Sequence, residues 1–168
     1  GAGLVTLAAP NFLIDLIDVV NLEVMTLPLE QTAVGNISHK AFESIINILP
    51  KFDLLLIGPG LSVSSSTQKF VRDLLAFISN EYPFLRVVID ADGLKSLRKR
   101  VRPFSMPAVI TPHFGELAYI LKRSVREIKE RPEYFAKKAA DKFNVVVVLK
   151  SHKTYVVEPE TDNYFLSE

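Results

Sequence analysis

Short runs of consecutive apolar residues are spaced along the chain and predict the strands of a sheet. The run at 54–57 has no polar break, a pattern typical of a short strand that is buried on both faces. Similar runs at 86–89, 108–110 and 145–149 predict three more strands. We expect these four runs to lie inside one sheet.

Apolar residues at helical spacing follow several of these runs. Ser65 with Gln68 three residues later predicts a capping box, and the helix that it opens is predicted to end by Pro83. Its apolar positions are Phe70, Val71, Leu74, Leu75 and Ile78. Pro132 predicts the first turn of a further helix. The inner side of that helix carries Tyr134, Phe135, Ala139, Ala140 and Phe143.

Weaker patterns complete the prediction. They indicate strands at 4–8 and 22–27, helices at 12–20, 38–49 and from 116 onwards, and a hairpin that joins 145–149 to 154–157. Strands that alternate with helices imply right-handed crossovers and a mostly parallel sheet. We therefore expect an α/β fold, a three-layer α/β/α sandwich, in a single domain that spans residues 1–168.

Composition narrows the class of protein. The 168 residues are 48% hydrophobic and carry a formal net charge of +1, so neither nucleic acid nor a membrane surface is favoured as a partner. The absence of cysteine excludes disulfides and thiolate catalysis and is compatible with a reducing compartment. No apolar run approaches the roughly 18 residues of a membrane helix. We expect a soluble, cytoplasmic protein.

Three loop motifs follow the predicted strands directly. They are GPGLS after 54–57, DADG after 86–89 and TPHFGE after 108–110. The carboxyl ends of parallel strands meet at one edge of a sheet, where ligands bind in open α/β folds. A strand, a glycine-containing loop and a helix also present free N–H groups to an anion.

Each motif also has a structural interpretation. GPGLS is neither a dinucleotide fingerprint, because position 63 is Val63, nor a P-loop, because no Gly-Lys-Ser/Thr follows. Taken alone, the motif favours a plain strand-to-helix turn over a binding loop. The carboxylates of Asp90 and Asp92 suit hydrated magnesium or a capping pair at a turn. His113 is a hydrogen-bonding imidazole or a surface residue, and Glu116 orients metal-bound water or sits favourably at a helix N-terminus.

Two groups of basic residues differ in interpretation. Lys150 ends an apolar strand, where an ammonium needs water or an anion. With Ser151, His152, Lys153 and Thr154 it forms either the lining of a nucleotide site or a solvated hairpin tip. The other group has no interleaved aromatic residues and indicates a solvated face rather than a nucleic-acid site. It consists of Lys95, Arg98, Lys99, Arg100 and Arg102.

The motifs occur in the order GAGLVTLAAP, FDLLLIGPGLS, VVIDADGL, VITPHFGEL and VVVVLKSHKTYVV. In this order they resemble the ADP- or ATP-dependent NAD(P)H-hydrate dehydratases, the carbohydrate-kinase-like domain of the ribokinase-like superfamily. The resemblance covers nearly the whole chain. It implies a repair enzyme that uses ADP or ATP to phosphorylate the hydroxyl of hydrated NADH or NADPH, after which loss of phosphate restores the dinucleotide.

The resemblance also implies roles for individual residues. Gly60, Ser62 and His113 would contact the hydrated dinucleotide, and Lys150, Ser151, His152, Lys153 and Thr154 would line the adenine nucleotide. Glu116, with Asp90 and Asp92, would organise Mg²⁺. A homo-oligomer and a fused or partner epimerase domain are further expectations. The chain departs from the family's usual pattern at Ser62, where glycine is common, at Phe114, where proline is common, and at Gly93, where alanine is common.

One part of the family pattern is missing. The resemblance implies a glycine-rich anion hole that ends in a catalytic aspartate, yet no glycine follows Gly115 in this sequence. Neither Asp141 nor Asp162 has suitable neighbours, so no residue is assigned as catalytic. The chain also opens at Gly1 without an initiator methionine. We therefore expect residues 1–168 to be an internal fragment that lacks both ends of its domain and is inactive alone.

Two other functions remain open at this point. A sugar or vitamin kinase of the same superfamily would share the DADG and nucleotide segments. A non-catalytic nucleotide-binding module would need no aspartate. Assays of hydrated NADH against a panel of alcohols separate the first alternative from the dehydratase.

Overall fold

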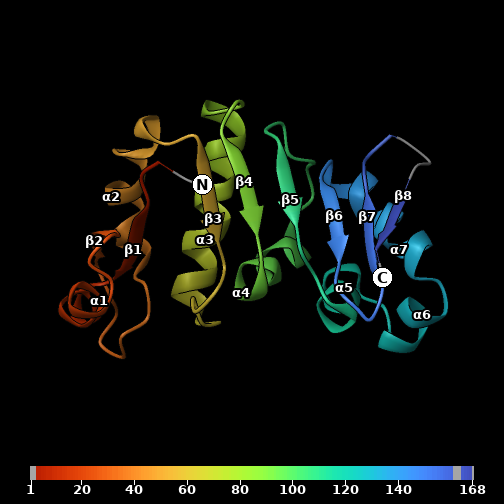
Figure 1. Cartoon of the computed structure of the whole chain (residues 1–168), viewed down its shortest axis with the longest axis horizontal. Coiled ribbons are helices and arrows are strands. Elements are labelled where there is room, and N and C mark those ends of the chain that lie inside the picture. Colours follow the sequence, from red (N-terminus) through yellow and green to blue (C-terminus); the bar gives the residue numbers. More distant parts are fainter. Residues whose placement is uncertain (1–2, 161–163, 168) are drawn as a thin grey trace.

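The computed structural model describes residues 3–160 and 164–167, and Gly1 and Asp162 lie outside these ranges. Its main element is a six-stranded sheet in the order β3-β4-β5-β6-β7-β8 (Figure 1). The strands are β3 (Leu54–Ile57), β4 (Arg86–Ile89), β5 (Ala108–Ile110), β6 (Val146–Leu149), β7 (Thr154–Val157) and β8 (Tyr164–Ser167). Strands β3 to β6 are parallel, whereas β7 and β8 are antiparallel to their neighbours. The predicted α/β class, mostly parallel sheet and hairpin are confirmed.

A second, smaller sheet forms at the start of the chain. β1 (Thr6–Pro10) and β2 (Met25–Leu29) pair in parallel, and the crossover between them contains a 3₁₀ turn (Asn11–Leu13) and α1 (Ile14–Val20). Figure 1 shows this unit at the left, beyond β3. The sequence therefore predicted these elements correctly, to within a few residues.

The remaining helices are α2 (Phe42–Ile46), α3 (Ser65–Glu81), α4 (Ala91–Leu94), α5 (Phe114–Leu121), α6 (Val125–Glu130) and α7 (Pro132–Phe143). Short 3₁₀ turns occupy His39–Ala41, Leu49–Lys51 and Lys95–Lys99.

The predicted capping box of α3 is wrong. Ser64 is the N-cap and accepts a hydrogen bond from the N–H of Thr67 at 3.1 Å. The side chain of Gln68 instead donates to the carbonyl oxygen of Asp92 at 3.2 Å. The sequence analysis missed α4, α6 and β8.

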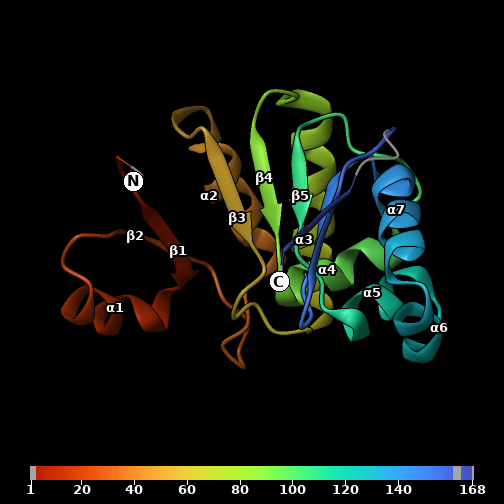
Figure 2. The same ribbon diagram turned by 45° about the vertical axis from the view of Figure 1, so that its right-hand side comes forward.

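The two faces of the main sheet differ in burial. One face carries buried residues such as Ile57, Ile89 and Ile110, which pack in a core with apolar residues of α3 and α7. Each fully buried side chain of this size contributes about 1.5–3 kcal/mol to folding. Figures 1 and 2 show α3, α5 and α7 on the same side of this sheet. On the other face Leu54 is 50% exposed and Leu56 is 58% exposed. The prediction that strand 54–57 is buried on both faces is therefore wrong. Among the described residues, no second layer of helices covers this face of the sheet.

No helix within the described ranges combines the length and apolarity that crossing a bilayer requires.

Candidate active site

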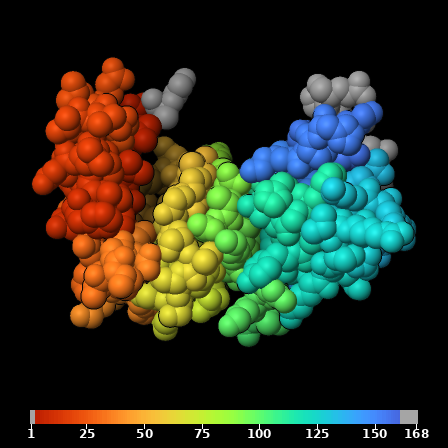
Figure 3. Space-filling view, turned by 90° about the horizontal axis from the view of Figure 1, so that it is seen from below, coloured from red at the N-terminus to blue at the C-terminus, as the bar shows by residue number. Residues whose placement is uncertain are grey.

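The loops that follow β3, β4, β5 and β6 lie along one edge of the main sheet. These strands are adjacent and parallel, and their register places Ile57 beside Ile89 and Ile89 beside Ile110. The edge is at the bottom of Figure 1, and Figure 3 views the molecule from that side. The three loop motifs and Lys150 are therefore brought together, as the sequence predicted.

The first two loops pack directly against each other. A Cβ atom on Gly58 would lie 1.7 Å from the carbonyl oxygen of Asp90, and one on Gly93 would lie 2.8 Å from that of Ile57. Gly58 therefore needs glycine, and a side chain at Gly93 would require the two loops to shift apart. Gly60 differs, because its φ is +74° but no atom lies within 4 Å of the place where a Cβ would be. The backbone at Gly60 is thus open to a ligand.

Two residues other than glycine hold left-handed backbone at this edge. Ser62 has a φ of 59° and Ala91 has a φ of 46°. The hydroxyl of Ser62 donates to the side-chain oxygen of Asn36 at 2.8 Å, which ties the loop after β3 to the segment after β2. Strained backbone of this kind is common at functional sites. Sequence reasoning missed Asn36, because nothing near it in the sequence indicates this contact.

Asp90 links two of the four loops. Its carboxylate accepts a hydrogen bond from the ammonium of Lys150 at 2.7 Å. Burial alone would raise the pKa of Asp90, but the hydrogen bonds from Lys150 and from the N–H of Ala91 outweigh it and lower the pKa below its usual value. Asp90 is therefore an ionised partner of Lys150 at neutral pH.

The backbone joins the same loops a second time. The N–H of Lys150 donates to the carbonyl oxygen of Pro112 at 2.8 Å, and His113 and Lys150 form an isolated parallel bridge. The side chain of Lys150 is 46% exposed. Its charge is thus held at the edge, beside His113, and stays accessible from solvent.

His113 and Glu116 cap helix α5. The Nδ1 atom of His113 accepts hydrogen bonds from the N–H groups of Gly115 at 2.9 Å and Glu116 at 3.3 Å. The Glu116 carboxylate accepts one from the N–H of His113 at 2.9 Å. Because Nδ1 is an acceptor, the neutral ring carries its proton on Nε2. Glu116 therefore lies in the first turn of α5, and the Nε2 atom of His113 lies 3.6 Å from the Glu116 carboxylate, beyond hydrogen-bond distance, on a side chain that is 60% exposed.

The candidate metal ligands are not gathered into a cluster. Asp92 pairs with Lys95 at 2.8 Å, Asp90 pairs with Lys150, and Glu116 takes part in the α5 cap. In the part of the chain that the structure describes, no three His, Asp or Glu side chains form a group suited to a metal ion. Their assignment to Mg²⁺ stays a prediction.

The segment from Lys150 to Thr154 forms the turn between β6 and β7, at the same edge. The hydroxyl of Ser151 accepts from the N–H of Lys153 at 3.3 Å, which closes the turn, and His152 is exposed. Thr154 begins β7. This geometry suits a hairpin tip and also places five polar residues at this edge, of which Lys150 contacts Asp90, so the nucleotide assignment stays a prediction.

Solved structures share this architecture. A ribokinase-like superfamily protein from Enterococcus faecalis has a TM-score of 0.76 at 20% sequence identity, with 99% of this chain and 53% of that chain covered. The ADP/ATP-dependent NAD(P)H-hydrate dehydratase from Bacillus subtilis, co-crystallised with ATP/Mg²⁺ and soaked with CoA, has a TM-score of 0.73 at 25% identity. That match covers 99% of this chain and 55% of the other. The predicted ribokinase-like fold is confirmed.

Relatives in sequence point to the same family. The bifunctional NAD(P)H-hydrate repair enzyme Nnr from Moorella thermoacetica is 34% identical over 167 residues, which are 98% of this chain and 31% of that protein. The ADP-dependent (S)-NAD(P)H-hydrate dehydratase from Lactiplantibacillus plantarum is 30% identical over 163 residues, or 95% of this chain and 52% of that protein. The chain thus spans about half or less of the length of these relatives. The NAD(P)H-hydrate dehydratase family model matches residues 1–168, and this chain belongs to that family.

Proposed function

We propose that this chain forms the substrate- and nucleotide-binding edge of an NAD(P)H-hydrate dehydratase, a lyase that repairs hydrated NADH and NADPH. The observation that carries the proposal is the pair of Lys150 and Asp90, which fixes a cation at the ligand edge of the sheet beside His113. The names of the relatives from M. thermoacetica and L. plantarum support this choice of substrate.

The reaction has two balanced steps. The terminal phosphoryl group of ATP or ADP moves to the hydroxyl oxygen of the hydrated nicotinamide ring, whose proton is released. The carbon–oxygen bond then breaks, phosphate leaves with the bonding electrons, and loss of a proton from the ring restores the double bond. Catalysis of this kind depends on positioning and on stabilising phosphate charge.

In this proposal the substrate lies over Gly60 and His113. The open space at Gly60 allows close approach to the backbone, and Nε2–H of His113 donates to the ring hydroxyl or carboxamide. Ser62 shapes the same loop through its bond to Asn36. The left-handed backbone at Ser62 is the conformation that the family's usual glycine would adopt freely.

The nucleotide would lie against Lys150 and the turn from Ser151 to Thr154. The half-exposed ammonium of Lys150 can neutralise a phosphate while Asp90 holds its position. Mg²⁺ is usually bound through one or two carboxylates together with substrate phosphates, so separate carboxylates are compatible with it. Glu116, Asp90 and Asp92 are the residues that would hold it, and Mg²⁺ would supply charge neutralisation for the phosphates.

The test uses the full-length protein with hydrated NADH and with ATP or ADP, and follows the return of NADH absorbance. Turnover with either nucleotide is the expected result. Phosphorylation of a sugar or vitamin in a parallel panel, with no NADH formed, would show a kinase instead. Absence of both activities, with nucleotide bound, would favour a non-catalytic module.

We further propose a homo-oligomeric state, a cytoplasmic location and a fused or partner epimerase domain. The bifunctional relative from M. thermoacetica supports the epimerase domain. Light scattering on the full-length protein tests the oligomeric state.

A further inference from the structure

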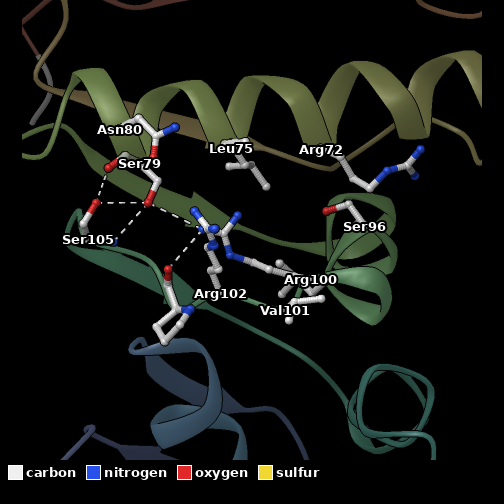
Figure 4. Close-up of a pocket in the computed structure, with 12 residues that line it drawn as sticks. Arg72, Leu75, Ser79, Asn80, Ser96, Arg100, Val101, Arg102 and Ser105 are labelled. Carbon is white, nitrogen blue, oxygen red and sulfur yellow. Dashed lines mark hydrogen bonds between the residues drawn. The ribbon is translucent and has the colours of Figure 1, made fainter.

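A second cavity lies away from the candidate active site, between α3 and the segment that leads into β5. It has a volume of about 500 Å³ and is lined partly by Ser79 near the end of α3 and by Ser105 just before β5 (Figure 4). Both residues precede a strand, so this end of the cavity lies toward the amino ends of the strands, whereas the candidate active site is at their carboxyl ends. Its size is in the range of small-molecule sites.

Three arginines line this cavity without a carboxylate. They are Arg72, Arg100 and Arg102, and no acidic residue is among the lining residues. In the described ranges none of the three forms an ion pair, although lysines and arginines elsewhere do. The sequence analysis treated the run from Lys95 to Arg102 as a solvated face. Arg102 is exposed as predicted, but Arg100 is only partly exposed.

Arg100 is held in one orientation at the centre of the cavity. Its Nη2 donates to the carbonyl oxygen of Pro103 at 3.3 Å and contacts the Ser79 hydroxyl at 3.5 Å, and its guanidinium carbon lies 3.5 Å from the centre of the Phe104 ring. Its Nε is buried and makes no hydrogen bond within the described part of the chain. Burial lowers the pKa of Arg100 to about 10. A charge that is desolvated but not neutralised favours an anion beside it.

Two serine hydroxyls lie next to this charge. They are 3.0 Å apart, the Ser105 hydroxyl donates to the carbonyl oxygen of Ser79, and the N–H of Ser105 donates to the Ser79 hydroxyl at 3.1 Å. Figure 4 shows Arg100 reaching toward these serines from the segment before β5, while Arg72 projects from α3. Guanidinium forks match the oxygens of a phosphate group.

We propose that this cavity is a second ligand site, which binds the phosphate or diphosphate group of a small molecule independently of the edge at Lys150. The cavity is distinct from the nucleotide site of the proposed function, so the proposal does not rest on that function. Free phosphate and a phosphate ester offer the same oxygens, and the experiment distinguishes them.

The test locates and measures binding on the full-length protein. Crystals are soaked with tungstate, a phosphate analogue that is visible by anomalous scattering. Calorimetry measures the affinity of the protein for inorganic phosphate, pyrophosphate and glycerol 3-phosphate. Arg100→Gln removes the central charge but also loses its bonds to Pro103 and Ser79. The double variant Arg72→Gln/Arg102→Gln removes two charges whose side chains make no hydrogen bond to the described residues. Arg123→Gln/Arg126→Gln is the matched control, because both residues lie at the surface in or beside α6 and pair only with Glu127 and Glu130 in the described chain.

We expect a tungstate peak in the cavity and at least a roughly tenfold loss of pyrophosphate affinity in the Arg72/Arg102 variant at unchanged Tm, because each charged hydrogen bond lost is worth about a factor of ten or more. The control should bind as the wild type does. Tighter binding of glycerol 3-phosphate than of phosphate identifies an ester as the ligand, and the reverse identifies the free ion.

No tungstate peak in the cavity, unchanged pyrophosphate affinity in the Arg72/Arg102 variant, or an equal loss of affinity in the control would overturn the proposal. Binding that is lost only in Lys150→Met would assign it to the other edge and would also overturn it.

Discussion

The ammonium of Lys150 lies 2.7 Å from the carboxylate of Asp90, although sixty residues separate them in the sequence. Lys150 follows β6 and Asp90 follows β4, so the pair spans the intervening loop after β5. It holds one positive and one negative charge at the edge where ligands bind in this class of fold. A phosphate that approached Lys150 would therefore meet a cation whose position is already fixed.

The pair of Lys150 and Asp90 gives a pH dependence of stability. Because the pKa of Asp90 is lowered in the folded state, ionised Asp90 stabilises the fold above the unfolded pKa of about 4. This contribution is lost as the pH falls through the folded pKa. We expect Lys150→Met to lower the free energy of unfolding by less than about 1 kcal/mol at neutral pH, since Lys150 is half-exposed. The difference should close in acid, as measured by urea denaturation across pH.

Lys129→Met is the control for this experiment, because it removes an exposed lysine of α6 that forms no ion pair with Asp90 in the described part of the chain. Its effect on unfolding should not follow the titration of Asp90. A pH-independent gap between wild type and Lys150→Met would show that the ion pair contributes nothing.

Two glycines of one loop should respond differently to alanine. Gly58→Ala would place a methyl group 1.7 Å from the carbonyl oxygen of Asp90, so we expect a loss of about 3 kcal/mol or more in unfolding free energy. Gly60→Ala meets no atom within 4 Å and bears only the backbone cost of a positive φ, about 1–2 kcal/mol. Thermal unfolding measures both. If Gly60→Ala stays folded, its catalytic efficiency should still fall, because the methyl group blocks the ligand's approach.

The edge of the sheet was predictable because its signals are local. Each strand is a short apolar run that ends at a glycine or a polar residue, namely Gly58, Asp90, Thr111 and Lys150, and parallel strands align their ends without further information. The start of α3 shows the limit of local rules. Ser64, Ser65 and Ser66 are all suitable caps, and only the folded geometry selects Ser64. The contacts of Lys150 with Asp90 and of Ser62 with Asn36 depend on tertiary structure, and no local pattern indicates them.

Burial was the other point at which the sequence misled. The unbroken run Leu54–Ile57 is typical of a strand covered on both sides, yet alternate residues are half-exposed here. An apolar run indicates that a strand can be buried, but only the structure shows whether another layer covers it. Helix α6 was missed because its six residues, VREIKE, contain too few apolar positions to show a helical period.

Ser62 allows the hydrogen bond and the backbone strain of its loop to be separated. Ser62→Ala keeps the left-handed backbone and loses the bond to Asn36, so we expect a destabilisation of about 1 kcal/mol. Ser62→Gly loses the same bond but relieves a conformation that costs about 1–2 kcal/mol in other residues. Glycine should therefore be the more stable of the two variants by chemical denaturation. Equal stability of the two would mean that the positive φ carries no strain.

His113 has a structural role as the cap of α5 and a proposed role in binding the substrate. Two substitutions allow these roles to be measured separately. The Nδ1 atom of His113 caps α5, while its Nε2 lies 3.6 Å from the Glu116 carboxylate, too far for a hydrogen bond. His113→Ala removes both functions, so we expect a loss of about 1 kcal/mol in unfolding free energy, as for other N-caps, together with a loss of activity. His113→Asn keeps a side-chain acceptor for the N–H groups of Gly115 and Glu116 but does not reproduce Nε2. It should unfold like the wild type and yet lose at least about tenfold in kcat/KM for hydrated NADH, the cost of one hydrogen bond to the reacting group. If His113→Asn had the same kcat/KM as the wild type, His113 would serve only as the cap of α5, and other residues of the edge would bind the substrate.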